Sequence, residues 1–144
     1  MIDLNRQARL HEAIELFFHA YRAFTAPPDR ILEARGLGRV HHRILYFVAR
    51  SPGTTVTALL GVPGVSKQAL NGPLRQLVEA GLVGTATGTH DKRSKLLSLT
   101  EAGAALEAEL SGTQMALLEE AFTAAGPDAE QAWRAHMGTL GAPG

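Results

Sequence analysis

The stretch "TTVTALLGVPGVSKQALNGPLRQLVEAGLV", residues 54–83, constrains the fold more than any other part of the chain. It predicts a short helix at about 56–60, a turn rich in glycine and proline, and a second helix that begins at Ser66 and ends before Gly81. Ser66 is a suitable N-cap. The apolar face of the second helix is predicted to consist of Leu70, Leu74, Leu77 and Val78. Two helices joined by a short glycine-containing turn are typical of a helix-turn-helix.

The pattern changes from helical to extended after this second helix. The segments "LVGTATGT" (82–89) and "KLLSLT" (95–100) are rich in β-branched and aliphatic residues, and the polar residues between them supply a turn. We therefore predict a β-hairpin, or wing, directly after the second helix. Thr100 then provides an N-cap for a long helix.

Amphipathic helices are also predicted on both sides of this segment. Asp3 is a plausible N-cap for the first, which we expect to stop at "TAPPD" because Pro27 disfavours helical geometry at Ala26. A short helix at 28–35, a helix at about 38–50, the long helix after Thr100 and a last helix from about 128 complete the chain. Their apolar stripes are longer than one small winged domain could cover, which predicts a dimer. The predicted interface residues are Leu10, Ile14, Phe17, Tyr21, Leu117, Phe122 and Trp133.

These elements predict a mainly α fold with a small β-hairpin wing, in a single domain of 144 residues. The winged helix-turn-helix is assigned to 36–100, and the N- and C-terminal dimerisation helices to 1–35 and 101–144.

The charges of the chain are distributed unevenly along the sequence, although the net charge is zero. Residues 1–50 and 66–95 are each net basic and residues 96–144 are acidic, as expected for a polyanion-binding head on a non-binding stalk, although ordinary scatter remains an alternative.

The second helix of the helix-turn-helix carries a polar face suited to the DNA major groove, where side chains near the start of such a helix reach base edges. The residues predicted to bind DNA there are Ser66, Lys67, Gln68, Asn71 and Arg75. Gln68 and Asn71 can pair with adenine, whereas Lys67 and Arg75 suit guanine or phosphate. The alternative is an ordinary solvated polar face.

The wing provides a second candidate contact with double-stranded DNA. Its predicted DNA-binding residues are His90, Asp91, Lys92, Arg93 and Lys95. An arginine at the tip of a wing can enter the narrow minor groove, where the negative potential is enhanced, and Asp91 would orient Arg93. The first wing strand carries no charge, so few backbone contacts are expected from it. A charged, solvated turn is the alternative.

The segment "DKRSKLLSLTEAG" (91–103) resembles the wing signature of the MarR family, Asp-x-Arg followed by an aliphatic run and Leu-Thr-x-x-Gly. Residues 52–83 look like the helix-turn-helix of that family, and "FTAPPDRILEARGLGRVHHRILYFVAR" resembles its PetP-like subgroup. The resemblance implies a homodimeric transcription factor that binds a pseudo-palindromic operator and is released by a small aromatic or carboxylic ligand. One departure is Pro73, which lies inside the predicted recognition helix and predicts a local bend there.

The histidines do not form a recognisable catalytic or metal site. "HEAIE" (11–15) has Glu15 where the second histidine of the zinc motif HExxH would stand, and the chain has no cysteine. His41 and His42 point about 100° apart on a helix. One of them, or Arg43, is the candidate lining of a ligand pocket near the dimer interface; a polar interface role is the alternative. We therefore expect no enzyme activity, no cofactor and no metal.

Two further expectations concern location and the rival function. No apolar stretch approaches the ~20 residues needed to span a bilayer, and the N-terminus lacks the layout of a signal peptide, so a cytoplasmic protein without membrane contact is expected. The rival function is a winged-helix module for protein–protein interaction without DNA binding. That module would tolerate loss of Lys67, Arg75 and Arg93, and its binding would not depend on salt.

Overall fold

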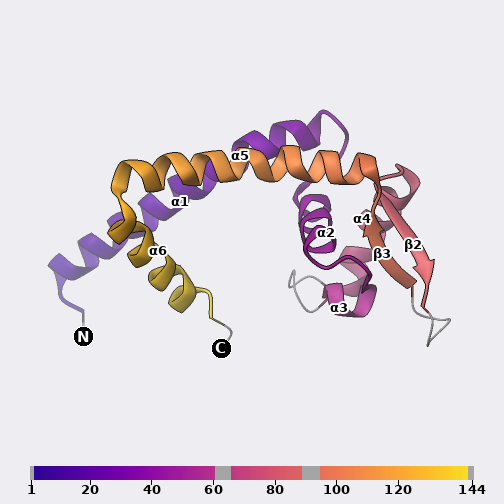
Figure 1. Ribbon diagram of the computed structural model, residues 1–144. Helices are drawn as coiled ribbons and strands as arrows, with labels where there is room; N and C mark the ends of the chain where they lie inside the picture. Colours follow the sequence, from indigo (N-terminus) through magenta and orange to yellow (C-terminus); the bar gives the residue numbers. More distant parts are fainter. Residues whose placement is uncertain (1, 61–65, 89–94, 143–144) are drawn as a thin grey trace.

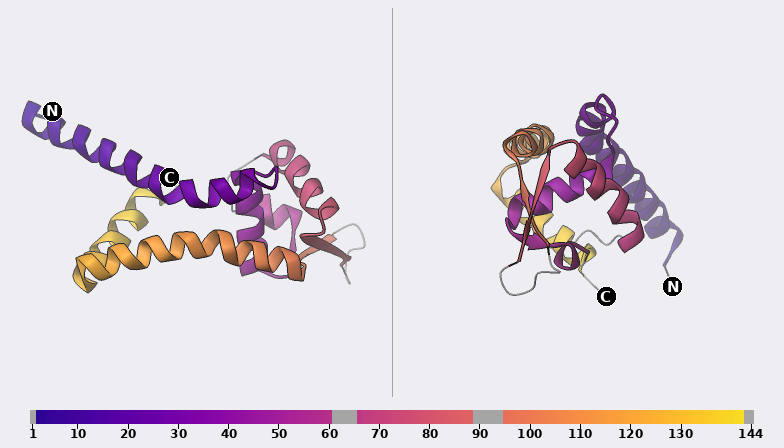
Figure 2. Two further views of the ribbon diagram at one scale, coloured as in Figure 1. Left: turned by 90° about the horizontal axis from the view of Figure 1, so that it is seen from above. Right: turned by 90° about the vertical axis from the view of Figure 1, so that its right-hand side faces the viewer.

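The computed structural model describes residues 2–60, 66–88 and 95–142. Along these residues the elements follow the order α1 (Leu4–Glu33), α2 (Arg39–Arg50), β1 (Thr54–Thr55), α3 (Val56–Leu60), α4 (Lys67–Glu79), β2 (Val83–Thr87), β3 (Lys95–Leu99), α5 (Glu101–Ala125) and α6 (Pro127–Leu140). Helix α5 runs the length of the molecule (Figure 1), with α2 to α4 and the sheet at one end and α6 at the other. Helix α1 packs against α5 and then projects away from it towards the N-terminus (Figure 2).

The hydrophobic core lies at the end of the molecule that contains the sheet. It joins α2, α3, α4, β2 and β3 to the first three turns of α5 and to one leucine near the end of α1. Its buried members are Leu32, Ile44, Leu45, Val48, Leu59, Leu70, Leu74, Leu77, Leu82, Val83, Leu97, Leu106 and Leu110. The predicted mainly α fold with a small β-hairpin is thus confirmed.

The sheet is antiparallel and has the strand order β1-β3-β2. The hairpin of β2 and β3 confirms the predicted wing, with Val83 opposite Leu99 and Thr87 opposite Lys95. The sequence did not predict β1, a strand of two residues in which Thr54 pairs with Leu97. The predicted turn of the wing falls within 89–94, outside the described residues.

The predicted helix starts after Asp3, Ser66 and Thr100 are confirmed by their side chains. Each accepts a hydrogen bond from the backbone N–H three residues later, at 2.7, 3.1 and 3.0 Å. Gly81 follows the C-cap residue of α4, Ala80. Its φ of 74° is a left-handed conformation that glycine adopts readily. The Thr100 hydroxyl also donates to the carbonyl of Gly81 at 2.6 Å, so it ties the start of α5 to the end of α4.

The predicted break at "TAPPD" is wrong, because α1 continues through Pro27 and Pro28 to Glu33. A proline in a helix deprives the carbonyl four residues earlier of its donor. Here the amide of Gln114 on α5 donates to the carbonyl of Phe24 at 3.4 Å, which replaces the donor that Pro28 lacks. Pro28 is itself buried, so tertiary packing offsets the local preference.

Two features of α4 also refine the sequence analysis. Val78 is 37 % exposed, so its assignment to the apolar face was wrong, and the buried face consists of the three leucines alone. The helix is continuous through Pro73.

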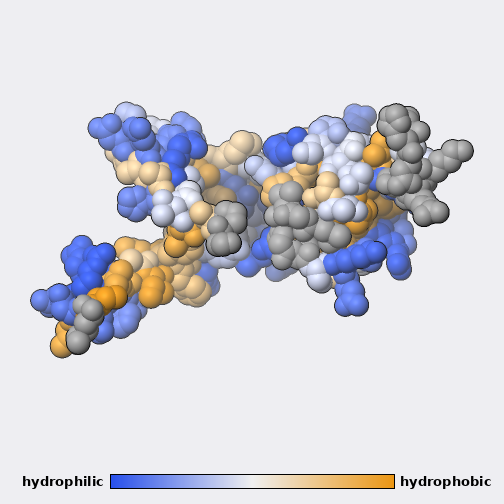
Figure 3. Space-filling model, turned by 90° about the horizontal axis from the view of Figure 1, so that it is seen from below, coloured by the Kyte–Doolittle hydropathy of each residue, from blue (hydrophilic) through white to orange (hydrophobic). Residues whose placement is uncertain are grey.

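The opposite end of the molecule carries large apolar side chains that are not covered. Those on α1, α5 and α6, together with Ile2 just before α1, are Ile2, Leu4, Ile14, Leu16, Phe17, Phe18, Tyr21, Met115, Trp133 and Leu140. Seen from below, apolar surface gathers along the projecting α1 and in the hollow between it and the lobe that contains α6 (Figure 3). Among the described residues, no helix has both the length and the apolarity needed to cross a bilayer.

Candidate functional site

Helix α4 separates an apolar face from a polar one. Leu70, Leu74 and Leu77 are buried in the core. The polar face consists of exposed residues at its N-cap and along its first three turns, namely Ser66, Lys67, Gln68, Asn71 and Arg75. All five are the residues that the sequence placed on a DNA-binding face, and the structure leaves them accessible together. Such a face can offer amide and cationic groups to a polar or anionic partner.

The hairpin lies at the same end of the molecule as α4 (Figure 1). Of its five predicted contact residues, Lys95 is exposed at the first position of β3. The other four predicted contacts, His90, Asp91, Lys92 and Arg93, lie outside the described residues. The described part of the hairpin ends at the pair of Thr87 and Lys95.

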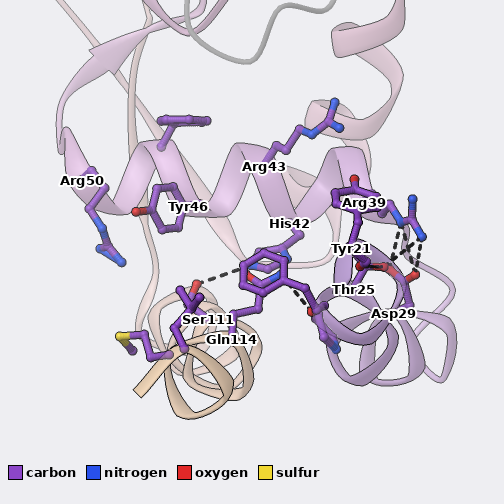
Figure 4. A pocket seen from close by; sticks show the side chains of 15 residues that line it. Tyr21, Thr25, Asp29, Arg39, His42, Arg43, Tyr46, Arg50, Ser111 and Gln114 are labelled. Carbon is purple, nitrogen blue, oxygen red and sulfur yellow. Dashed lines mark hydrogen bonds and ion pairs between the residues drawn. The ribbon is translucent and has the colours of Figure 1, made fainter. Parts of the chain in front are cut away.

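A second candidate site is a cavity of about 590 Å³ between α1, α2 and α5. This volume falls in the range of small-molecule pockets. Its lining residues are Tyr21, Phe24, Thr25, Pro28, Asp29, Arg39, His42, Arg43, Tyr46, Phe47, Arg50, Ser111, Gln114, Met115 and Leu118. Figure 4 shows their side chains, which combine aromatic rings with several cationic groups.

Arg39 and Asp29 form an ion pair at one side of this cavity. The guanidinium nitrogen Nη2 of Arg39 lies 2.9 Å from Asp29 Oδ2, and it also donates to the hydroxyl of Thr25 at 3.3 Å. The guanidinium lies over the ring of Tyr21. The hydrogen bond and the charge of Asp29 raise the pKa of Arg39. This pair joins the first residue of α2 to α1.

A second ion pair joins α2 to α5 at the other side. Arg50 Nη2 lies 2.7 Å from Oε1 of Glu107, whose side chain is buried. The hydroxyl of Ser111 donates to the same oxygen at 2.9 Å. Arg50 also lies over the ring of Tyr46, with 4.5 Å between the guanidinium carbon and the ring centre. Because Glu107 is buried, removing Arg50 would leave a desolvated carboxylate.

The adjacent histidines face different elements. His42 lines the cavity, and its Nε2 lies 3.4 Å from Oγ of Ser111 on α5. Burial lowers the pKa of His42, and this effect outweighs the opposing charges of Glu107 and Asp29. His41 is not among the lining residues: it lies between Gly38 and Gln76 of α4. Of the three predicted pocket residues, the structure brings His42 and Arg43 together at the cavity.

Arg43 differs from the other two arginines that line the cavity. Its side chain extends from α2 away from Ser111 and Asp29 (Figure 4). Within the described part of the chain it forms no ion pair, whereas Arg39 and Arg50 each have a carboxylate partner. Arg43 is therefore the lining cation whose charge no described carboxylate within 4 Å offsets.

Sequence reasoning missed both ion pairs of the cavity. Their partners are separated by 10 residues for Arg39 and Asp29 and by 57 for Arg50 and Glu107, so no helical spacing relates them. Among the described residues, no group of three or more histidine, aspartate or glutamate side chains is placed to hold a metal ion.

The comparisons with known proteins agree with a winged helix-turn-helix. Residues 35–94 match the MarR family. The HTH-type transcriptional regulator PetP of Rhodobacter capsulatus is 51% identical over 126 residues, which span 88% of this chain and 76% of PetP. The chain belongs to the MarR family. The two matches confirm the resemblance to this family and to its PetP-like members. Like other MarR-family proteins, the chain is a transcriptional regulator and not an enzyme.

Solved MarR-family structures share the fold. A crystal structure of a MarR family transcription regulator has a TM-score of 0.77 at 23% identity, covering 94% of this chain and 90% of its own. S. aureus MepR, solved as a complex with DNA, has a TM-score of 0.71 at 16% identity and covers 88% and 93%. A Mycobacterium tuberculosis MarR family protein, solved with p-aminosalicylic acid, has a TM-score of 0.61 at 22% identity and covers 89% and 97%.

Proposed function

We propose that this MarR-family regulator acts in the cytoplasm as a homodimer that binds a pseudo-palindromic DNA operator and is released by a small aromatic or carboxylic ligand. The observation that carries the DNA-binding part is the polar face of α4, from Ser66 to Arg75, opposite its buried leucines. A helix exposed in this way can enter the major groove while its apolar face remains in the core.

The chemistry of this face suits base edges and phosphates. Gln68 and Asn71 each carry an amide that can make two hydrogen bonds to adenine, and Lys67 and Arg75 can contact guanine or phosphate. The wing residues, with Arg93 as the candidate minor-groove contact, follow in the segment between β2 and β3. The relative MepR has been solved bound to DNA, which supports this role for a chain of the same fold.

The uncovered apolar residues support a dimer. The seven predicted interface residues lie on α1, α5 and α6, and of these Ile14 is 65 % exposed, Phe17 49 % and Tyr21 43 %. Phe122 and Trp133 form an edge-to-face pair between α5 and α6, with ring centres 5.2 Å apart. An apolar surface of this kind is rarely left in contact with water. Residues 1–35 and 101–144 would then form the dimerisation region and 36–100 the DNA-binding region.

The cavity supports release by a small ligand. Its aromatic and aliphatic side chains suit an apolar ring, and its lining also contains cationic residues that suit an acidic group. Arg39 and Arg50 are each paired with a carboxylate, whereas Arg43 would have to turn towards the cavity to contact such a ligand (Figure 4). The M. tuberculosis relative solved with p-aminosalicylic acid shows that a chain of this fold accommodates an aromatic acid.

Selection of duplexes from a randomised pool tests the DNA-binding proposal. We expect an inverted repeat, bound with an affinity that falls steeply as salt increases. Arg75→Ala should weaken binding of the selected duplex about 10- to 100-fold, the cost of one lost bidentate base contact. Arg134→Ala is the matched control, because Arg134 pairs with Glu130 on α6, far along the chain from α4.

Arg93→Ala tests the wing in the same assay. The expected loss is again large, because minor-groove contacts by arginine depend on its charge. Failure of a folded dimer to enrich any duplex, with salt-independent binding to a protein partner, would contradict the proposal and favour the interaction module.

A further inference from the structure

His41 lies in the third position of α2 and fills the space between the start of that helix and α4. Its side chain is buried, with 8 % of the residue exposed. The backbone N–H of Gly38 donates to Nδ1 of the ring at 2.9 Å. On the opposite side of the ring, Nε2 lies 2.7 Å from Oε1 of Gln76. One imidazole therefore connects the N-terminus of α2 to α4.

These two contacts determine where the ring carries its proton. A backbone N–H can only donate, so Nδ1 must accept and carries no hydrogen. The neutral ring then holds its proton on Nε2, and Nε2–H donates to Gln76 Oε1. Both ring nitrogens are thus satisfied in a buried position, as buried polar groups require. The imidazole acts as a directional connector between the two helices.

The hydrogen bond between His41 and Gln76 restricts the rotation of α4 in a way that the packing of its buried leucines does not. Leucine packing fixes how deeply α4 lies in the core, but apolar attraction has no preferred direction. A hydrogen bond depends strongly on angle and distance, and so limits rotation of the helix about its axis. Among the described residues, the other side-chain hydrogen bond near α4 comes from Thr100 to the carbonyl of Gly81, which lies beyond the end of the helix. Gln76 directly follows Arg75, so its position bears on where the DNA-facing side chains point.

We propose that His41 is a positioning residue for α4: through Gln76 it sets the rotation of the recognition helix and thereby the preference for the operator over unrelated DNA. The proposal rests on the proposed DNA-binding function. Affinity for any duplex depends on the charges of the protein, whereas preference for one sequence depends on side chains that meet base edges in register. Loss of the connector should therefore reduce preference and leave non-specific affinity unchanged.

A matched pair of variants at Gln76 tests the proposal. Gln76→Leu removes the acceptor at similar volume, and Gln76→Glu keeps an acceptor oxygen at the same position. The dissociation constants of the selected duplex and of a scrambled duplex are measured at equal salt. Gln76→Leu should lower the ratio of the two affinities about fivefold, the effect of one net hydrogen bond. Gln76→Glu should weaken both duplexes by charge and keep the ratio.

A double-mutant cycle then asks whether Gln76 acts through His41. His41→Asn keeps an oxygen near the place of Nδ1 to accept from Gly38, but its side chain is too short to reach Gln76. The combined variant should lose no more preference than Gln76→Leu alone. Circular dichroism shows whether each variant folds, and the Gln76 pair is sufficient if His41→Asn does not.

Two results would overturn the inference, and a third would overturn the function on which it rests. Equal ratios for Gln76→Leu and Gln76→Glu would show that the acceptor is irrelevant. Additive losses in the cycle would show that Gln76 acts independently of His41. A wild-type protein with no preferred duplex would instead overturn the proposed function itself, before any variant is compared.

Discussion

Large apolar side chains are buried at one end of the molecule and exposed at the other. Around the sheet, thirteen apolar residues of the described part of the chain are buried together, from Leu32 to Leu110. Along the projecting part of α1, the second half of α5 and α6, residues of similar size remain exposed, among them Phe17 and Trp133. We refer to these as the core end and the open end.

This difference is the basis of the proposed dimer, in which a second chain would cover the open end. The core end has a sheet, capped helices and a set of apolar side chains that are buried together, as an autonomous unit requires. The open end has helices with apolar stripes and no second layer to cover them. A second copy of the chain would provide that layer, so the open end is where assembly should alter stability most.

Two glycines on α5 allow the sharpest test, because Gly103 lies against the core end and Gly112 lies just beyond Leu110, the last core residue of this helix. A Cβ on Gly103 would overlap the carbonyl oxygen of Leu82, and backbone cannot move aside as a side chain can. Gly103→Ala should therefore lower the free energy of unfolding by about 3 kcal/mol. Gly112 has no atom within 4 Å of the same position, so Gly112→Ala should raise stability by up to ~1 kcal/mol through helix propensity.

Chemical denaturation followed by circular dichroism measures both glycine variants. Equal effects of the two substitutions would show that α5 is no more tightly packed at Gly103 than beyond the core, and the comparison would fail.

A charge placed on the open end should affect assembly next most strongly. Phe17→Glu puts a carboxylate into the predicted apolar interface, where burying it without a partner is costly. We expect the dissociation constant of the dimer to rise about 30-fold or more, which corresponds to ~2 kcal/mol. Sedimentation velocity over a concentration series measures this constant.

Val78→Glu is the control for this substitution. Val78 is also an exposed apolar residue, but it lies on α4 at the core end. Its change to glutamate should leave the sedimentation coefficient unchanged. A shift of both variants towards monomer would argue that the interface is not confined to the open end.

The smallest expected effect concerns His42, at the boundary between the two ends. Burial lowers its pKa in the folded protein below the ordinary value of 6.5, so between these two values the unfolded chain binds more protons. Its contribution to stability is therefore complete above pH 6.5 and is lost as the pH falls through the lowered pKa. His42→Gln should flatten this part of the curve.

Urea unfolding midpoints of wild type and His42→Gln are measured from pH 7.5 down to about pH 5. The difference between the two curves gives the contribution of His42 to the pH dependence of stability. An identical slope in both proteins would contradict the assignment of this proton uptake to His42.

Local signals predicted most of the fold. Asp3, Ser66 and Thr100 cap their helices as expected, because capping involves residues only three positions apart. The wing strands followed from their β-branched and aliphatic residues. The prediction failed at Pro27 and Pro28, where the deciding contact comes from Gln114 on α5, far away in the sequence. It also missed β1, since a strand of two residues has no periodicity.

The candidate site was predictable only where it depends on one element. The polar face of α4 is a property of helical spacing, and the five residues that the sequence assigned to it are exposed. The pairs of Arg39 with Asp29 and Arg50 with Glu107, and the contact of His41 with Gln76, join different helices. Such contacts depend on how helices cross, which spacing along one chain does not encode.

Helix α5 belongs to both ends of the molecule, and this makes its length as important as its side chains. Its first turns carry Leu106 and Leu110 of the core, and its last turn carries Phe122 against α6. Each residue added to a helix advances the following part by about 1.5 Å and turns it by about 100°. A single insertion after Leu110 would leave the core end intact but redirect the open end, so this helix should accept many substitutions and few changes of length.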